Sequence, residues 1–168
     1  LIPGPVSPAF WLGLAFQMPS LTSTVIGLTG LVMMIRTGSC NLANPEQMRA
    51  LQWASLGAVV LGWLLLLDTF ALLPLSLYSI GFGPAALGAT AFLASLPWIV
   101  SGPRHPARVI SILLWVVLLS HVLLRLPTGN VWDALLDPLL WGALQLGWLV
   151  RGVRRVNAAW RQPQATHA

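Results

Sequence analysis

The chain has 168 residues, of which 57% are hydrophobic and only 8% carry a charge. Soluble domains carry about 25% charged residues because their surfaces face water, so this composition excludes an ordinary soluble domain and indicates lipid as solvent. The formal net charge is +5. Nucleic acid is not an expected partner, because the arginines lie between and after apolar stretches rather than on one soluble face.

The first two apolar segments each predict a membrane-spanning helix. One covers about residues 10–35, long enough to cross a bilayer with tilt, and Pro19 predicts a kink within it. The other covers about residues 50–67 and follows a helix-start signal. There Asn44 is the expected N-cap, and Gln47 is placed to complete a capping box.

The remaining chain predicts three more spans. Residues 69–82 are broken by Pro74 and Gly81 and indicate a linker at the membrane interface. The predicted fold is an all-α integral membrane protein, a compact bundle of about five transmembrane helices. The last three expected helices cover about residues 83–100, 109–126 and 131–150, which gives a transmembrane domain over 1–150 and a basic cytoplasmic tail over 151–168.

Arginine placement predicts the orientation of this bundle. With five spans, the arginines of the first and third loops and of the tail share one side, and only Arg125 lies opposite. Positive residues concentrate on the cytoplasmic side, so the N-terminus is expected outside and the C-terminus in the cytoplasm. The expected location is a bacterial inner membrane. Arg151, Arg154 and Arg155 are expected to fix this orientation or to bind anionic lipid head groups.

Polar side chains at membrane depth gather near the outer side in this topology. Charged groups at such depth usually face a partner or a water-filled cavity. The tight turn after residue 126 places Arg125 level with Asp133, and His121 level with Asp137. The cluster is a candidate site for a proton relay, a small polar ligand or a lipid head group. Its members are Gln17, Asp68, His121, Arg125, Asp133 and Asp137.

A structural interpretation of the same residues is favoured over the functional one. Asp133 is placed to cap helix N-terminal amides, and Arg125 is placed to snorkel or to pair with it. A hydrogen bond between His121 and Asp137 would fasten two helices. Asp68 is expected to end its helix at head-group level.

Small residues recur at four-residue spacing and indicate faces where helices approach closely. We expect these faces to pack inside the bundle or against a partner. They comprise Ala54, Ala58 and Gly62 in one helix and Ala86, Thr90 and Ala94 in the next.

No metal or cofactor is expected. Cys40 is the single cysteine, and the sequence has no HExxH motif, no CxxC motif and no nucleotide-binding glycine loop. A bis-histidine haem site needs two histidines at membrane depth, and only His121 qualifies.

Three classes of function compete on these observations. The first is a non-catalytic integral subunit of a larger membrane complex, with lipids and other membrane subunits as partners. The second is a small transporter or channel component with an outward-facing polar site, which the proline-broken helices favour. The third is a membrane-embedded enzyme acting on a lipid-linked substrate, with His121 and Asp137 as acid and base and Arg125 holding the head group.

Overall fold

A computed structural model of the chain describes residues 19–38, 44–101, 106–124 and 129–161. All regular secondary structure in these residues is helical, as the sequence predicts. The helices are α2 (Leu21–Thr37), α3 (Pro45–Thr69), α4 (Leu77–Ile80), α5 (Pro84–Ser101), α6 (Arg108–Leu124), α7 (Val131–Leu135) and α8 (Pro138–Arg161).

Helix α2 begins where the sequence predicts a kink. Ser20, directly after Pro19, is the N-cap, and its hydroxyl accepts a hydrogen bond from the Ser23 amide at 3.1 Å. The helix ends at Gly38, whose φ of 63° is the left-handed conformation that glycine adopts without steric cost. The first nine residues of the predicted segment 10–35, including Gln17, lie outside the described residues.

Helix α3 starts earlier than its apolar segment because its capping signal lies upstream. The Asn44 amide donates to the Gln47 side chain at 2.9 Å, and Pro45 occupies the first turn. At 25 residues α3 is about 37 Å long, more than the ~30 Å hydrocarbon core of a bilayer.

The surroundings of α3 separate it from the core helix of a soluble protein. Its most apolar window has a mean hydropathy of 1.9, and none of that window is buried inside the molecule. Among the described helices only α3 meets both the length and the hydropathy expected of a complete span, while α2, α5 and α6 are shorter apolar helices. The helical class is therefore confirmed, and the five-span arrangement stays a prediction.

The most extensive contact between two of the described helices joins α5 to α6. The small side chains Ala86, Thr90 and Ala94 are all buried, and Ala86 belongs to a core that includes Leu118 of α6 and Val131 of α7. Small residues let the backbones of two helices approach closely.

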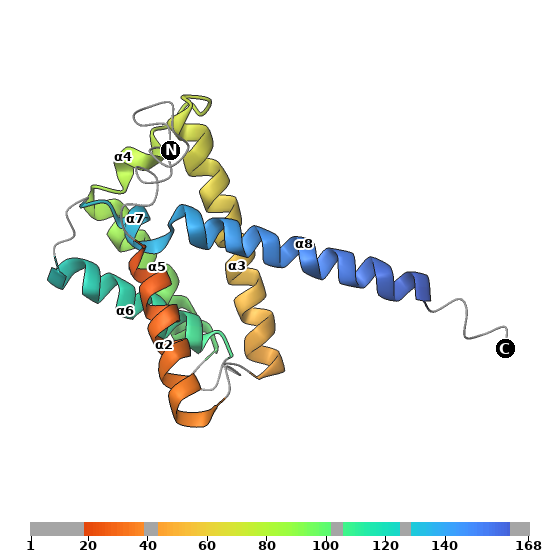
Figure 1. The fold of residues 1–168 in the computed structure, drawn as a ribbon. Coiled ribbons are helices and arrows are strands. Elements are labelled where there is room, and N and C mark those ends of the chain that lie inside the picture. Colours follow the sequence, from red (N-terminus) through yellow and green to blue (C-terminus); the bar gives the residue numbers. More distant parts are fainter. Residues whose placement is uncertain (1–18, 39–43, 102–105, 125–128, 162–168) are drawn as a thin grey trace, which may run out of the picture.

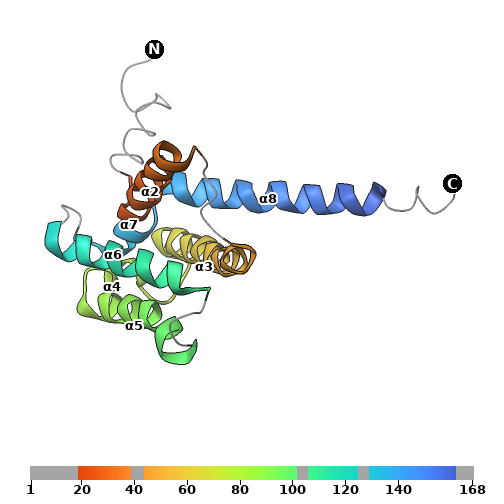
Figure 2. The ribbon, with the colours of Figure 1, turned by 90° about the horizontal axis from the view of Figure 1, so that it is seen from below.

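The helices cross one another more than an up-and-down bundle would. Figure 1 shows α2 and α3 running lengthwise, with α8 crossing α3 and extending well beyond the other helices. Figure 2, seen from below, shows the same extension of α8. The C-terminal ends of α2 and α5 and the N-terminal ends of α3 and α6 lie toward the lower end in Figure 1. Arg36, Arg49 and Arg108 belong to these ends.

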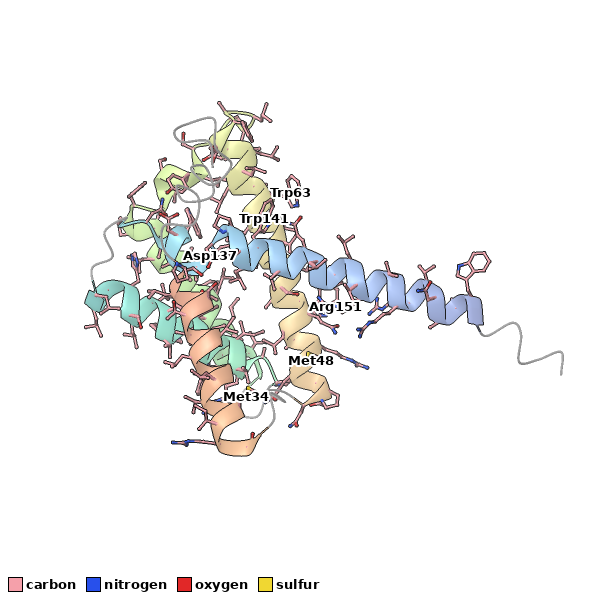
Figure 3. The ribbon with its side chains drawn as sticks, in the orientation of Figure 1. Met34, Met48, Trp63, Asp137, Trp141 and Arg151 are labelled. Atoms are coloured by element: carbon pink, nitrogen blue, oxygen red, sulfur yellow. The ribbon has the colours of Figure 1, made fainter. Side chains whose placement is uncertain are left out.

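Two tryptophans of α8 fasten it to α3. The Trp141 indole donates to the Val59 carbonyl at 3.1 Å, and the Trp148 indole donates to the Ser55 hydroxyl at 3.1 Å. The ring of Trp141 also packs edge-on against Trp63, with centroids 5.1 Å apart (Figure 3). On this side of α3, the predicted small residues Ala54, Ala58 and Gly62 are half-buried, with Gly62 beneath the Trp141 ring.

Replacing Gly62 by alanine tests this contact. A Cβ at this position would lie 2.3 Å from the Trp141 indole nitrogen, so the ring must move and lose its bond to Val59. We expect Gly62→Ala to destabilise the protein by about 1–3 kcal/mol, measured as a lower midpoint of unfolding in detergent. Gly57→Ala is the matched control, because its Cβ meets nothing within 4 Å. Equal midpoints for both variants would contradict the contact.

Candidate functional site

The polar residues of the candidate cluster lie around α7, a five-residue helix between α6 and α8. The sequence predicts one continuous helix over 131–150, but Leu136 is extended (φ −144°, ψ 125°) and divides it. Pro138 then starts α8, where its missing N–H costs nothing. Asp137 thus becomes the N-cap of α8, and one of its carboxylate oxygens accepts from the Leu140 amide at 2.6 Å.

The second oxygen of Asp137 binds the start of α2. It accepts from the Ser20 amide at 2.8 Å and from the Ser23 hydroxyl. Figure 3 shows Asp137 where α2, α7 and α8 meet, and only 6% of the residue is exposed. The N-terminal ends of two helices, each with partial positive charge, therefore share one buried carboxylate.

This arrangement replaces the expected pairing of Asp137 with His121. His121 is buried on α6 with 8% exposed, but its Nδ1 has no hydrogen-bond partner within the described part of the chain, and no bond joins it to Asp137. The expected register assumed an unbroken helix after the turn. The break at Leu136 removes that register. Arg125 lies outside the described residues, so its predicted pairing with Asp133 stays a prediction.

A second group of polar residues ties the α4 segment to α7. Asn130 is the N-cap of α7: its side-chain oxygen accepts from the Trp132 amide at 2.9 Å, and its nitrogen donates to the Tyr78 carbonyl at 3.0 Å. The Trp132 indole donates to the Leu77 carbonyl at 2.9 Å. The Val131 amide completes the tie with a 2.9 Å bond to the carbonyl of Gly81.

Asp68 and Asp133 both receive hydrogen bonds from Tyr78. The Tyr78 amide donates to Asp68 at 2.8 Å, and its hydroxyl donates to the two Asp133 oxygens at 3.2 and 3.1 Å. Burial, followed by the charge of Asp133, raises the pKa of Tyr78, so the phenol stays a donor. Asp133 lies in the first turn of α7, but the capping expected of it is performed by Asn130. Helix α3 ends one residue after Asp68, at Thr69.

Sequence reasoning missed several partners of the aspartates. Ser20 and Ser23 precede Asp137 by more than 110 residues, so no local pattern connects them. The cap role of Asp137 did carry a local signal, since an aspartate followed by proline and an apolar run is a typical helix start. No local signal connected Tyr78 to Asp68 or Asp133, because a single tyrosine in an apolar linker does not indicate which residue it will bind.

The chemistry open to these residues is narrow. The three described aspartates of the cluster all accept hydrogen bonds from within the chain. No group of three or more histidine, cysteine, aspartate or glutamate side chains is placed to hold a metal ion in the described ranges. An open apolar groove between α3 and α8, lined by Leu56, Val59, Trp148 and Leu149 among others, offers few polar atoms to a ligand.

Comparison with family models, curated proteins and solved structures finds no match to this chain. The interpretation of the site therefore depends on its geometry.

Replacing Asp137 by asparagine tests the shared carboxylate. An amide has one acceptor oxygen where three donors converge, so at least one helix-terminal N–H loses its partner. We expect Asp137→Asn to lower the free energy of unfolding by about 1–3 kcal/mol, measured by denaturant titration in detergent. Glu46→Gln, an exposed carboxylate in the first turn of α3, is the control. A loss no larger than that of the control would show that the carboxylate does not hold the two helices.

Replacing Gly81 by alanine tests the tie between α4 and α7. The new Cβ would lie 2.0 Å from the side-chain oxygen of Asn130 and 2.4 Å from the Trp132 ring. Asn130 is fully buried and cannot move without uncapping α7. We expect a loss of about 1–3 kcal/mol and a changed tryptophan emission spectrum. Gly88→Ala, whose Cβ meets nothing within 4 Å, should leave the spectrum unchanged; the same spectrum in both variants would refute the tie.

Proposed function

We propose that this chain is a non-catalytic integral subunit of a larger membrane protein complex in the bacterial inner membrane. One observation carries the proposal: the described aspartates of the candidate cluster serve as helix caps and loop ties. Asp137 joins α2 to α8, and Asp68 and Asp133 hold the α4 segment. A catalytic or transporting site keeps some of its acidic groups free for a substrate or a proton, whereas a scaffold uses them internally.

The exposed apolar faces support the membrane part of the proposal. Large apolar side chains are exposed on every long helix, up to 78% for Leu123 of α6 and 75% for Ile35 of α2. A soluble monomer does not leave such faces open to water. Lipid covers part of this surface in the proposal, and neighbouring subunits cover the rest.

The proposed topology retains five crossings, the last formed by α7 and the first half of α8, with an outer N-terminus and a cytoplasmic C-terminus. Helix α3 crosses the bilayer completely. Helices α2, α5 and α6 have 17 or 18 residues, at the short end of the range that spans a bilayer. Arg36, Arg49 and Arg108, at the ends of α2, α3 and α6 that lie toward one end of the molecule, would then face the cytoplasm, as the concentration of positive charge requires.

His121 favours a second candidate function, a small transporter or channel component. Its Nδ1 is buried without a hydrogen-bond partner in the described ranges, and an imidazole nitrogen in that position can accept and release a proton in a relay. The two candidates differ in what His121→Gln does. In a scaffold the variant leaves the function of the assembly intact. In a transporter it abolishes transport without loss of protein.

Mild solubilisation from the native membrane, followed by size analysis and mass spectrometry of co-purifying proteins, tests the proposal. We expect a particle larger than one chain with a different membrane protein at fixed stoichiometry. Loss of that partner from the Gly81→Ala variant, but not from Gly88→Ala, would show that assembly depends on the contacts between the α4 segment and α7. A lone monomer or homo-oligomer would overturn the subunit proposal and favour transport.

A further inference from the structure

The far half of α8 extends beyond the rest of the molecule, and its side chains divide into two faces. Figures 1 and 2 both show this end of the helix free of the other helices. Four large apolar side chains recur at the spacing i, i+4, i+7 and i+11, which places them along one stripe. Each is between 56% and 76% exposed: Leu149, Val153, Val156 and Trp160.

The opposite face of this segment is cationic. Arg151, Arg154 and Arg155 lie there by the same helical spacing, and α8 contains no aspartate or glutamate. The guanidinium of Arg151 stacks over the Trp148 ring at 4.9 Å, so its stem lies against the helix. Arg154 and Arg155 are exposed. An apolar stripe opposite arginines is typical of helices that lie in a membrane interface.

The contacts with α3 indicate the depth at which this segment would lie. Trp141 binds α3 at Val59 and Trp148 binds it at Ser55, so α8 proceeds toward the N-terminal end of α3, where Arg49 lies. Ser55 is five residues, or about 7.5 Å, inside the start of the apolar segment at residue 50. Interfacial helices bury their apolar face about 5–10 Å below the head groups, which matches this depth.

We propose that residues 149–161 form an interfacial helix on the cytoplasmic membrane surface, with the stripe Leu149, Val153, Val156 and Trp160 facing the acyl chains. Arg151, Arg154 and Arg155 bind the phosphates of anionic lipids. Anionic lipid is the expected ligand because of charge complementarity: three arginines without an acidic neighbour on α8 match an anionic surface. The inference rests on the membrane location in the proposed function and adds a lipid class and a binding segment to it.

Nitroxide labels on the full chain, reconstituted in phosphatidylcholine vesicles with and without phosphatidylglycerol, test the inference. In a Cys40→Ser background, single cysteines replace Val156 on the stripe, Ala158 on the arginine face and Val60 on α3. Collisions with oxygen report contact with lipid, and collisions with a nickel chelate report contact with water. We expect Val60 and Val156 to favour oxygen and Ala158 to favour nickel, with a stronger contrast when phosphatidylglycerol is present.

Removing charge should release the segment from the anionic surface. Arg154→Gln with Arg155→Gln should lower the ratio of lipid-buried to water-exposed label at Val156 by about five-fold per arginine, while Arg36→Gln, a matched change on α2, leaves it unchanged.

The remaining outcomes separate the two proposals. Water contact at Val60 would overturn the membrane location itself. Lipid contact at Val60 with water contact at both Val156 and Ala158 would overturn only the interfacial helix. Equal collision rates in both vesicle types would overturn the binding of anionic lipid. Shielding of the Val156 label only when a protein partner is bound would also overturn it, in favour of an acidic protein segment.

Discussion

The arrangement of α2, α7 and α8 depends on one buried carboxylate. The first turn of any helix leaves N–H groups without partners, and a carboxylate away from water is costly unless donors surround it. At Asp137 these two costs offset each other, because the starts of α2 and α8 both donate to the same side chain. The break before Pro138 allows Asp137 to cap α8, because in a continuous helix Asp137 would lie on the side of the helix and not at the N-terminal end.

The junction at Asp137 sets the direction of α8, and this direction brings α8 into contact with α3. Starting at Asp137, α8 reaches α3, where Trp141 and Trp148 bind it and where Gly62 leaves room for an indole ring. The other end of α7 is held independently, by Asn130 and the α4 segment. A five-residue helix is thus fixed at both ends by polar contacts. The described aspartates that the sequence marks as candidates for chemistry thus take part in contacts between helices and loops.

The sequence predicted the parts of this fold that depend on local patterns. Hydropathy located four of the apolar helices to within a few residues where they are described, and the start of α3 followed from Asn44 and Gln47. The same method failed at Leu136, because apolar residues on both sides of the break suggested one span. It also missed the length of α8, whose stripe of apolar residues continues past residue 150 between the arginines.

The candidate site was harder to predict than the helices. The sequence singled out Asp68, Asp133 and Asp137, but it could not identify their donors, because Ser20, Ser23 and Tyr78 are distant in the chain and chemically ordinary. The expected pairing of Asp137 with His121 depended on an unbroken helix. The hydrogen-bond partners of these aspartates depend on the residue at which each helix begins. A hydropathy profile averages over many residues and does not locate those positions.

A double-mutant cycle between Ser23 and Asp137 tests the shared carboxylate most directly. The free energy of unfolding would be measured for Ser23→Ala, Asp137→Asn, the pair and the unaltered chain in one detergent. Because the Ser23 hydroxyl donates to Asp137, the combined loss should be smaller than the sum of the single losses by at least about 0.5 kcal/mol. Losses that add to within about 0.3 kcal/mol would show that the two side chains do not interact, and the junction of α2 with α8 would have to be held by something else.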